Sequence, residues 1–171
     1  PPVEPELLRS AGKPRVSDQQ RSDNMAELWA LLGCTTEEER LRVCRRAHEL
    51  ATQPPEVLRE RLQRLAAALD VSVAEAAGMA RMQPTILTTS SEELLLANVA
   101  FLQLEVFGGS LAAMLKGVAS TPALLKYRPS SLAAKLAVLE QLLGGRAEAP
   151  KVARAQPRLL TFDASKVQRN A

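Results

Sequence analysis

A short proline-led motif recurs along this chain. It reads Pro84-Thr85-Ile86-Leu87, Pro122-Ala123-Leu124-Leu125 and Pro157-Arg158-Leu159-Leu160, and a similar motif, Pro55-Glu56-Val57-Leu58, precedes them. The four prolines are 29, 38 and 35 residues apart. Recurrence at this scale is typical of repeat proteins, in which one unit cannot cover its own apolar face and must stack on a neighbour. The motif therefore predicts a repeat architecture.

The segments between the prolines favour helices. Hydrophobic residues make up 46% of the chain and are mostly Leu and Ala, while aromatic residues make up only 3%. Leu, Ala, Glu, Arg and Gln lose little side-chain freedom in a helix, and the alternation of a half-buried strand is rare here. We predict an all-α fold.

Breaks at regular positions divide each repeat into a long and a short helix. Gly108-Gly109 and Gly144-Gly145 are 36 residues apart, and Asp70-Val71 takes the same place in an earlier unit. Each unit is thus predicted as helix, turn, helix and proline turn. The last residue of each motif is predicted to lie in the core: Leu87, Leu125 and Leu160.

Helix starts are marked by residues that cap an N-terminus. Capping boxes, in which a Ser or Thr is followed three residues later by Glu, occur at Thr36, Ser72 and Ser90. Either Ser130 or Ser131 is expected to cap the last long helix. The apolar face of that helix is predicted to hold Leu132, Leu136, Leu139 and Leu143.

The first third of the chain is predicted to differ from the repeats. Residues 1–21 are rich in proline and lack an apolar face, which indicates an extended arm. Residues 22–53 are predicted to form a helical pair: the first helix starts near Ser22–Asn24 and stops at Gly33, and the second follows Thr36. The buried face of the second helix is predicted to hold Leu41, Cys44 and His48, and to extend to Ala51. Residues 54–171 hold the repeats.

The proline turn, long helix, glycine-ended break and short helix resemble the mitochondrial transcription termination factor family over about Pro54 to Ala171. Units of that family contain two antiparallel helices and a short 3₁₀ turn. The resemblance implies a short right-handed α-solenoid with proline-marked turns, located in the mitochondrion, with the chloroplast as the alternative. It also implies a basic concave face that binds duplex DNA or RNA. The 38-residue spacing is also similar to the unit length of the octotricopeptide repeats, a second family, whose members bind single-stranded organellar RNA.

Positive charge is concentrated at one end. Residues 111–171 hold ten Lys or Arg and three acids, a net charge of +7, so residues 1–110 carry −4. Lys and Arg supply most nucleic-acid affinity through phosphate contacts. Tyr127 is the one attractive base-stacking candidate, and Lys135 is expected to be simply exposed. The predicted nucleic-acid-binding residues are Lys116, Lys126, Tyr127, Arg128, Arg146, Lys151, Arg154, Arg158, Lys166 and Arg169.

Other classes of function find little support in the residues. One histidine and no glycine-rich phosphate loop argue against familiar enzymes, small-molecule substrates and cofactors. Cys34, Cys44 and His48 are too few for a structural zinc site, so no metal is expected. No apolar run reaches the roughly 18–20 residues of a membrane span. The chain begins with Pro1, as removal of a targeting peptide or truncation would leave it.

Three functions remain open at this point. The first is an accessory subunit that holds rRNA in an organellar ribosome, in contact with RNA and with neighbouring proteins of a ribonucleoprotein assembly. The small number of units favours it over a DNA-encircling protein. The second is a free regulator of organellar transcription or RNA stability that binds duplex DNA or RNA. The third is a protein scaffold whose grooves between units grip peptides or helices.

Overall fold

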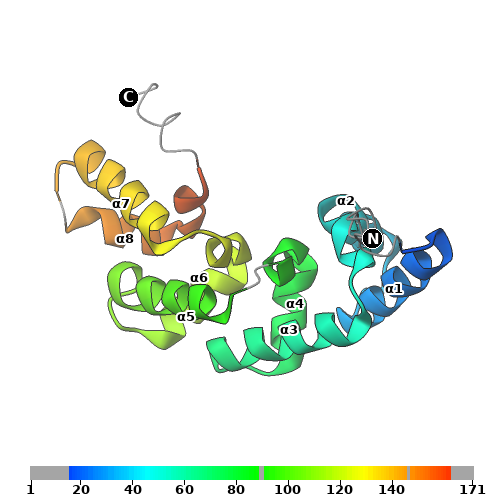
Figure 1. Ribbon diagram of the computed structural model, residues 1–171. Coiled ribbons are helices and arrows are strands. Elements are labelled where there is room, and N and C mark those ends of the chain that lie inside the picture. Colours follow the sequence, from blue (N-terminus) through cyan, green and yellow to red (C-terminus); the bar gives the residue numbers. More distant parts are fainter. Residues whose placement is uncertain (1–15, 89–90, 146, 163–171) are drawn as a thin grey trace, which may run out of the picture.

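The computed structural model describes residues 16–88, 91–145 and 147–162, and every regular element in these ranges is a helix (Figure 1). The prediction of an all-α chain is confirmed. The elements fall into four units, each with a first helix, a second helix and a 3₁₀ helix.

The first two units are the simplest. Unit 1 contains α1 (Asp18–Leu31), α2 (Glu37–Ala47) and the 3₁₀ helix η2 (His48–Thr52). Unit 2 contains α3 (Pro55–Leu69), α4 (Val73–Met82) and the 3₁₀ helix η3 (Pro84–Thr88).

The last two units follow the same order. Unit 3 contains α5 (Glu92–Phe101), a π-helical turn η4 (Leu102–Val106), α6 (Leu111–Ser120) and the 3₁₀ helix η5 (Pro122–Lys126). Unit 4 contains α7 (Pro129–Leu143), α8 (Glu148–Ala155) and the 3₁₀ helix η6 (Pro157–Thr161).

The spacing of the first helices is constant. They begin at Asp18, Pro55, Glu92 and Pro129, 37 residues apart in every case. Unit 1 is therefore one of the repeats and not a separate helical pair. The prediction that Pro55 begins a fourth proline turn is wrong, because Pro55 is the first residue of α3, where a missing N–H costs nothing. The equivalent turn is η2, which begins at His48.

The units follow one another along a curved row, from α1 and α2 at one end to α7 and α8 at the other (Figure 1). First helices contact one another in the order α1, α3, α5 and α7, and η5 contacts both η3 and η6. One apolar core runs through the units, from Met25 to Leu160. Its members include Leu87, Leu125 and Leu160, at most 1% exposed, as predicted.

The predicted breaks are present. Gly33, Asp70, Gly108 and Gly144 follow the first helices, and all four have a positive φ of 54–69°. This left-handed conformation ends a helix and is easiest for glycine. Asp70 adopts it in unit 2, where the sequence offers no glycine.

Two of the predicted capping boxes are confirmed, at Thr36 with Glu39 and at Ser72 with Glu75. The other two predicted starts are wrong. The cap of α5 is Ser91 and not Ser90. Helix α7 starts at Pro129 without a side-chain cap, since proline at the first helical position already fixes a helical φ.

Two expectations for unit 1 are also wrong. Helix α1 starts at Asp18 with Ser17 as its cap, so residues 18–21 are helical and not part of an extended arm; residues 1–15 lie outside the described residues. In α2 the buried residues are Val43 and Ala47, whereas Leu41 is 45% exposed and His48 is exposed at the helix end.

Among the described residues, no single helix is long and apolar enough to cross a membrane. The bent pair Glu92–Val106 and Leu111–Ser120 meets the requirements of length and composition only when both parts are taken together.

Candidate nucleic-acid interface

A polar side chain in each first helix closes its own unit. It donates a hydrogen bond to the carbonyl of the fourth residue of the 3₁₀ helix that ends the unit, at 2.8–3.0 Å. We call these four bonds the seam. Its donors, 37 residues apart, are Asn24, Arg61, Asn98 and Lys135, and its acceptors are the carbonyls of Ala51, Leu87, Leu125 and Leu160. The seam fixes where each 3₁₀ helix lies against its first helix.

Lys135 belongs to the seam, so the expectation that it is simply exposed is wrong. Its ammonium donates to the Leu160 carbonyl at 2.8 Å and lies 3.6 Å from the centre of the Tyr127 ring. A cation over an aromatic face is attracted by the ring quadrupole. The side chain is half-buried, and its ammonium is bound by η6 and by the Tyr127 ring.

Tyr127 has a structural role in addition to the one predicted. Its hydroxyl donates to the Thr161 carbonyl at 3.0 Å, which attaches the link between η5 and α7 to η6. One face of the ring carries the Lys135 ammonium. The residue proposed as a stacking platform is therefore half-buried and bound on two sides by unit 4.

The predicted cationic residues fall into three groups. Within the described residues, Lys116, Lys126, Arg128 and Arg158 are exposed and form no ion pair. Two others have local partners: Lys151 pairs with Glu148 at 2.8 Å, and Arg154 Nε donates to the Pro150 carbonyl at 3.2 Å. Arg146, Lys166 and Arg169 lie outside the described residues.

Three of the unpaired cations come from adjoining segments. Lys126 ends η5, Arg128 precedes α7, and Arg158 is the second residue of η6. The bond from Tyr127 to Thr161 holds these segments together, and the red η6 lies beside the start of α7 in Figure 1. We call these three residues the basic edge. Lys116 lies apart from it, on α6.

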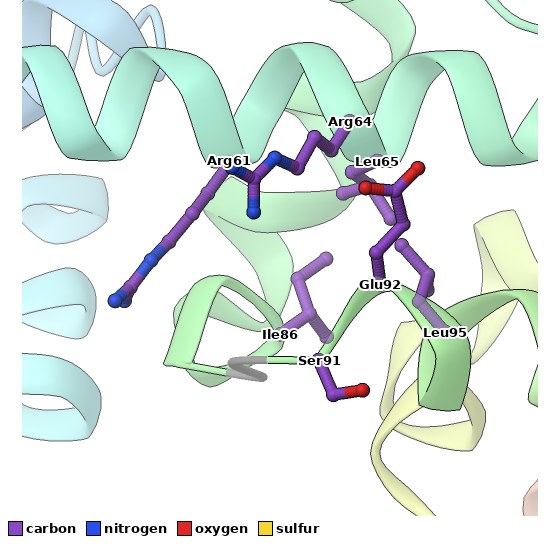
Figure 2. A pocket seen from close by; sticks show the side chains of 7 residues that line it. All are labelled: Arg61, Arg64, Leu65, Ile86, Ser91, Glu92 and Leu95. Carbon is purple, nitrogen blue, oxygen red and sulfur yellow. The ribbon is translucent and has the colours of Figure 1, made fainter.

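A small pocket lies between α3, η3 and α5 (Figure 2). Its volume is ≈ 20 Å³, which is room for about one water molecule and not for an organic ligand. Figure 2 shows Arg61 reaching away from this pocket, and its Nη1 donates to the Leu87 carbonyl. Arg64, on the same wall, pairs with Glu60. Both arginines of the pocket thus already have partners within the protein, a backbone carbonyl for Arg61 and a carboxylate for Arg64.

The fold shifts the pKa of two helix-capping carboxyls and of one thiol. Hydrogen bonds from the backbone of Thr35 and Thr36 lower the pKa of Glu39, and bonds from Ser72 lower the pKa of Glu75. Burial raises the pKa of the Cys34 thiol. The two carboxylates are helix caps, so their shifts are explained by helix starts and not by chemistry on a substrate.

The sequence missed the seam because its donors differ in type. Asn24 and Asn98 are uncharged, whereas Arg61 and Lys135 are cationic. The one available signal was their 37-residue spacing, which the proline spacings of 29, 38 and 35 obscured.

No protein-family model matches this chain, and no curated protein matches it in sequence. The resemblance to the mitochondrial transcription termination factor family stays a prediction.

Proposed function

We propose that this protein is an RNA-binding helical-repeat protein, built as a short right-handed α-solenoid and acting as an accessory subunit that holds rRNA in a mitochondrial ribosome. The observation that carries the proposal is the basic edge: Lys126, Arg128 and Arg158 are exposed cations on adjoining segments without an ion pair among the described residues. Unpaired cations on a rigid support suit phosphate groups, whose contacts dominate nucleic-acid affinity.

The architecture favours recognition of the phosphate backbone of RNA over recognition of its bases. The seam and the bond from Tyr127 to Thr161 hold the segments of the basic edge in place, so its backbone needs little ordering when the cations bind. Tyr127 is half-buried and its hydroxyl is bound to Thr161, which argues against a base stacking on this ring. Recognition by phosphate contacts and shape is what folded rRNA offers. The order of two helices and a 3₁₀ turn in every unit agrees with the solenoid that the resemblance implied.

The test is a salt-dependent binding titration of the full chain with structured RNA, single-stranded RNA and duplex DNA. The double variant Lys126→Gln with Arg158→Gln should reduce the slope of log affinity against log salt by about 1.4–1.8, since each phosphate contact contributes about 0.7–0.9. The matched control is Arg45→Gln with Arg59→Gln. It removes two exposed, unpaired arginines of the first two units and should leave the slope unchanged.

The outcomes separate the functions. Tightest binding to structured RNA, with the loss confined to the first variant, supports the proposal. Tightest binding to duplex DNA would replace it with the regulator of transcription. Equal losses in the two variants would mean non-specific attraction, and no binding at low salt would rule out nucleic-acid binding by the isolated chain.

A further inference from the structure

One position on the second helices is occupied by arginine in three of the four units. It lies three residues before the 3₁₀ helix, and its occupants in chain order are Arg45, Arg81, Ala119 and Arg154. Unit 3 is the exception.

At the first junction, between units 1 and 2, this arginine ties the units together. Arg81 Nη1 donates to the Gly33 carbonyl at 2.7 Å, in the break of unit 1. Its Nε lies 3.2 Å from Oε1 of Glu39, whose other oxygen caps α2. One guanidinium thus spans a break carbonyl and a capping carboxylate, and both are acceptors suited to its fork of donors.

At the third junction, between units 3 and 4, the arginine lies in the same place. Arg154 Nη1 would be 3.0 Å from a Cβ on Gly108, and Arg81 Nη1 would be 3.7 Å from a Cβ on Gly33. Both glycines are the left-handed residues of the preceding break. The position of the guanidinium beside the break glycine is therefore repeated two units later, although Arg154 donates to the Pro150 carbonyl and has no carboxylate partner among the described residues.

At the second junction Ala119 supplies no such group, and an open groove is found there. The groove lies between α4 and α6, has a volume of ≈ 440 Å³ and is lined by Val71, Glu75, Met79, Met82, Leu115 and Ala119 among others. Its apolar wall is accessible, since Met82 is 43% exposed. Methionine adapts readily to varied apolar partners.

The carboxylate that holds Arg81 at the first junction has a counterpart in this groove, and the break residue has a counterpart beside it. Glu75 corresponds to Glu39, because each is the third residue of its helix and completes a capping box. Oε2 of Glu75 accepts from the Ser72 backbone and hydroxyl, as Oε2 of Glu39 accepts from Thr36. Unlike Glu39, Glu75 forms no ion pair within the described residues. Asp70, the counterpart of Gly33, directly precedes the groove residue Val71.

We propose that this groove binds a segment of a partner protein that inserts an arginine side chain where units 2 and 4 supply their own. The guanidinium pairs with Glu75, and apolar residues beside it cover Met79, Met82 and Leu115. Two cations also line the groove: Lys116, which has no ion pair among the described residues, and Arg81, which pairs with Glu39. The segment therefore carries an acidic residue and not a second cation near its arginine.

The chain itself provides a probe. Residues 75–82 read Glu-Ala-Ala-Gly-Met-Ala-Arg-Met, which combines an acid, methionines and the tying arginine. A fluorescent, acetylated and amidated peptide of this sequence is titrated against the full chain, and a second peptide carries citrulline in place of arginine. Citrulline keeps the shape and removes the charge. We expect the arginine peptide to bind at least about tenfold more tightly, as a charge-assisted pair is roughly twice as strong as a neutral bond.

Three variants locate the binding. Ala119→Arg should fill the groove from within, and Glu75→Gln keeps the cap, because glutamine also completes a capping box, but loses the charge. Both should weaken binding of the arginine peptide about tenfold, while the control Glu93→Gln on exposed α5 surface should not change it. Equal binding of the two peptides, undiminished binding to Ala119→Arg, or no binding to the unaltered chain would each overturn the proposal.

A thermal measurement checks the groove without any peptide. Ala119→Arg should raise the unfolding temperature, and the gain should disappear when Glu75→Gln is added, as a double-mutant cycle requires of a direct pair. A gain that survives Glu75→Gln would show that arginine at this position does not use the carboxylate. Neither experiment contains nucleic acid, so a negative result leaves the RNA-binding proposal standing.

Discussion

The first two units and the last two share one plan but use their cations differently. In units 1 and 2 most arginines have a partner: Arg42 pairs with Glu38, Arg64 with Glu60 and Arg81 with Glu39, and Arg46 donates to the Met82 carbonyl. In units 3 and 4, Lys116, Lys126, Arg128 and Arg158 are unpaired within the described residues. Cationic side chains in one repeat can thus bind groups of the fold itself, while those in another repeat stay available to a ligand.

In the seam, by contrast, different residue types make the same hydrogen bond in all four units. Units 1 and 3 close with asparagine, and units 2 and 4 close with a cation. What is kept is a donor that reaches a fixed carbonyl. Because a hydrogen bond requires only distance and direction, an amide, a guanidinium or an ammonium can serve the same place.

The largest effect is expected from matched core deletions in the two halves. Leu58 and Leu132 are each the fourth residue of their helix, α3 and α7, and both are fully buried. Leu58→Ala and Leu132→Ala should each lower the free energy of unfolding by about 2–5 kcal/mol, through lost burial and the cavity left behind. Urea unfolding followed by hydrogen exchange measures this. If either variant accelerates exchange in its own half alone, the halves do not unfold as one.

Two glycines on second helices should respond in opposite directions. A Cβ on Gly117 of α6 would lie 2.3 Å from the Phe107 ring, whereas nothing lies within 4 Å of a Cβ on Gly78 of α4. Gly117→Ala should therefore destabilise by about 1–3 kcal/mol through overpacking. Gly78→Ala should stabilise by about 0.5–1 kcal/mol, because alanine is the better helix former. Thermal unfolding of both variants decides the signs, and a stable Gly117→Ala would contradict the close packing of Phe107.

The two asparagines of the seam should differ in the stability they contribute. Oδ1 of Asn24 accepts from Gln20 Nε2 at 2.9 Å, but the buried Oδ1 of Asn98 has no partner within the described residues. Asn24→Ala should therefore cost about 1 kcal/mol more than Asn98→Ala, the usual worth of one hydrogen bond. Urea midpoints compare the pair.

A variant that adds the missing hydrogen bond tests the same prediction from the other side. Leu94 precedes Asn98 by four residues, as Gln20 precedes Asn24. Leu94→Gln should offer the missing donor and bring the cost of Asn98→Ala up to that of Asn24→Ala. If Asn98→Ala costs the same free energy of unfolding with and without Leu94→Gln, the glutamine does not donate to Asn98 Oδ1.

The smallest expected effect is a loss of stability of the first two units at low pH. The lowered pKa values belong to Glu39 and Glu75, both in the first two units. A carboxyl with a pKa lower in the folded state stabilises the fold above its unfolded value of about 4.3, and this stability is lost as the pH falls through the folded pKa. Hydrogen exchange at decreasing pH should therefore show α2 and α4 loosening first. Glu39→Gln and Glu75→Gln, which keep the caps, should reduce the pH dependence.

Local signals in the sequence predicted much of this fold. Leu-rich and Ala-rich segments specify helices, left-handed breaks fall at Gly33, Asp70, Gly108 and Gly144, and the capping boxes at Thr36 and Ser72 are self-contained over four residues. Each feature depends on neighbours close in the chain. For that reason each could be predicted without knowledge of the packing.

Features that depend on packing could not be predicted in this way. The turn at His48 lacks the proline that marks the other three, so unit 1 did not look like a repeat. The buried side of α2 is chosen by contact with η2 and α4, not by its own composition. For the candidate site, sequence placed cations in units 3 and 4 but could not separate Lys126, which is unpaired within the described residues, from Lys151, which pairs with Glu148.

The groove at the second junction also bears on the shape of the molecule. Units 2 and 3 touch through α3 and α5 and through η5, which contacts both η3 and α4, whereas α4 and α6 lie on opposite walls of the groove. The seam lies within each unit, so a side chain inserted into the groove would press on the junction and leave the closing hydrogen bond of each unit in place. A side chain beside Ala119 would therefore act as a spacer between units 2 and 3. Curvature of the row, and with it the direction in which the two halves point, would then depend on what occupies one gap.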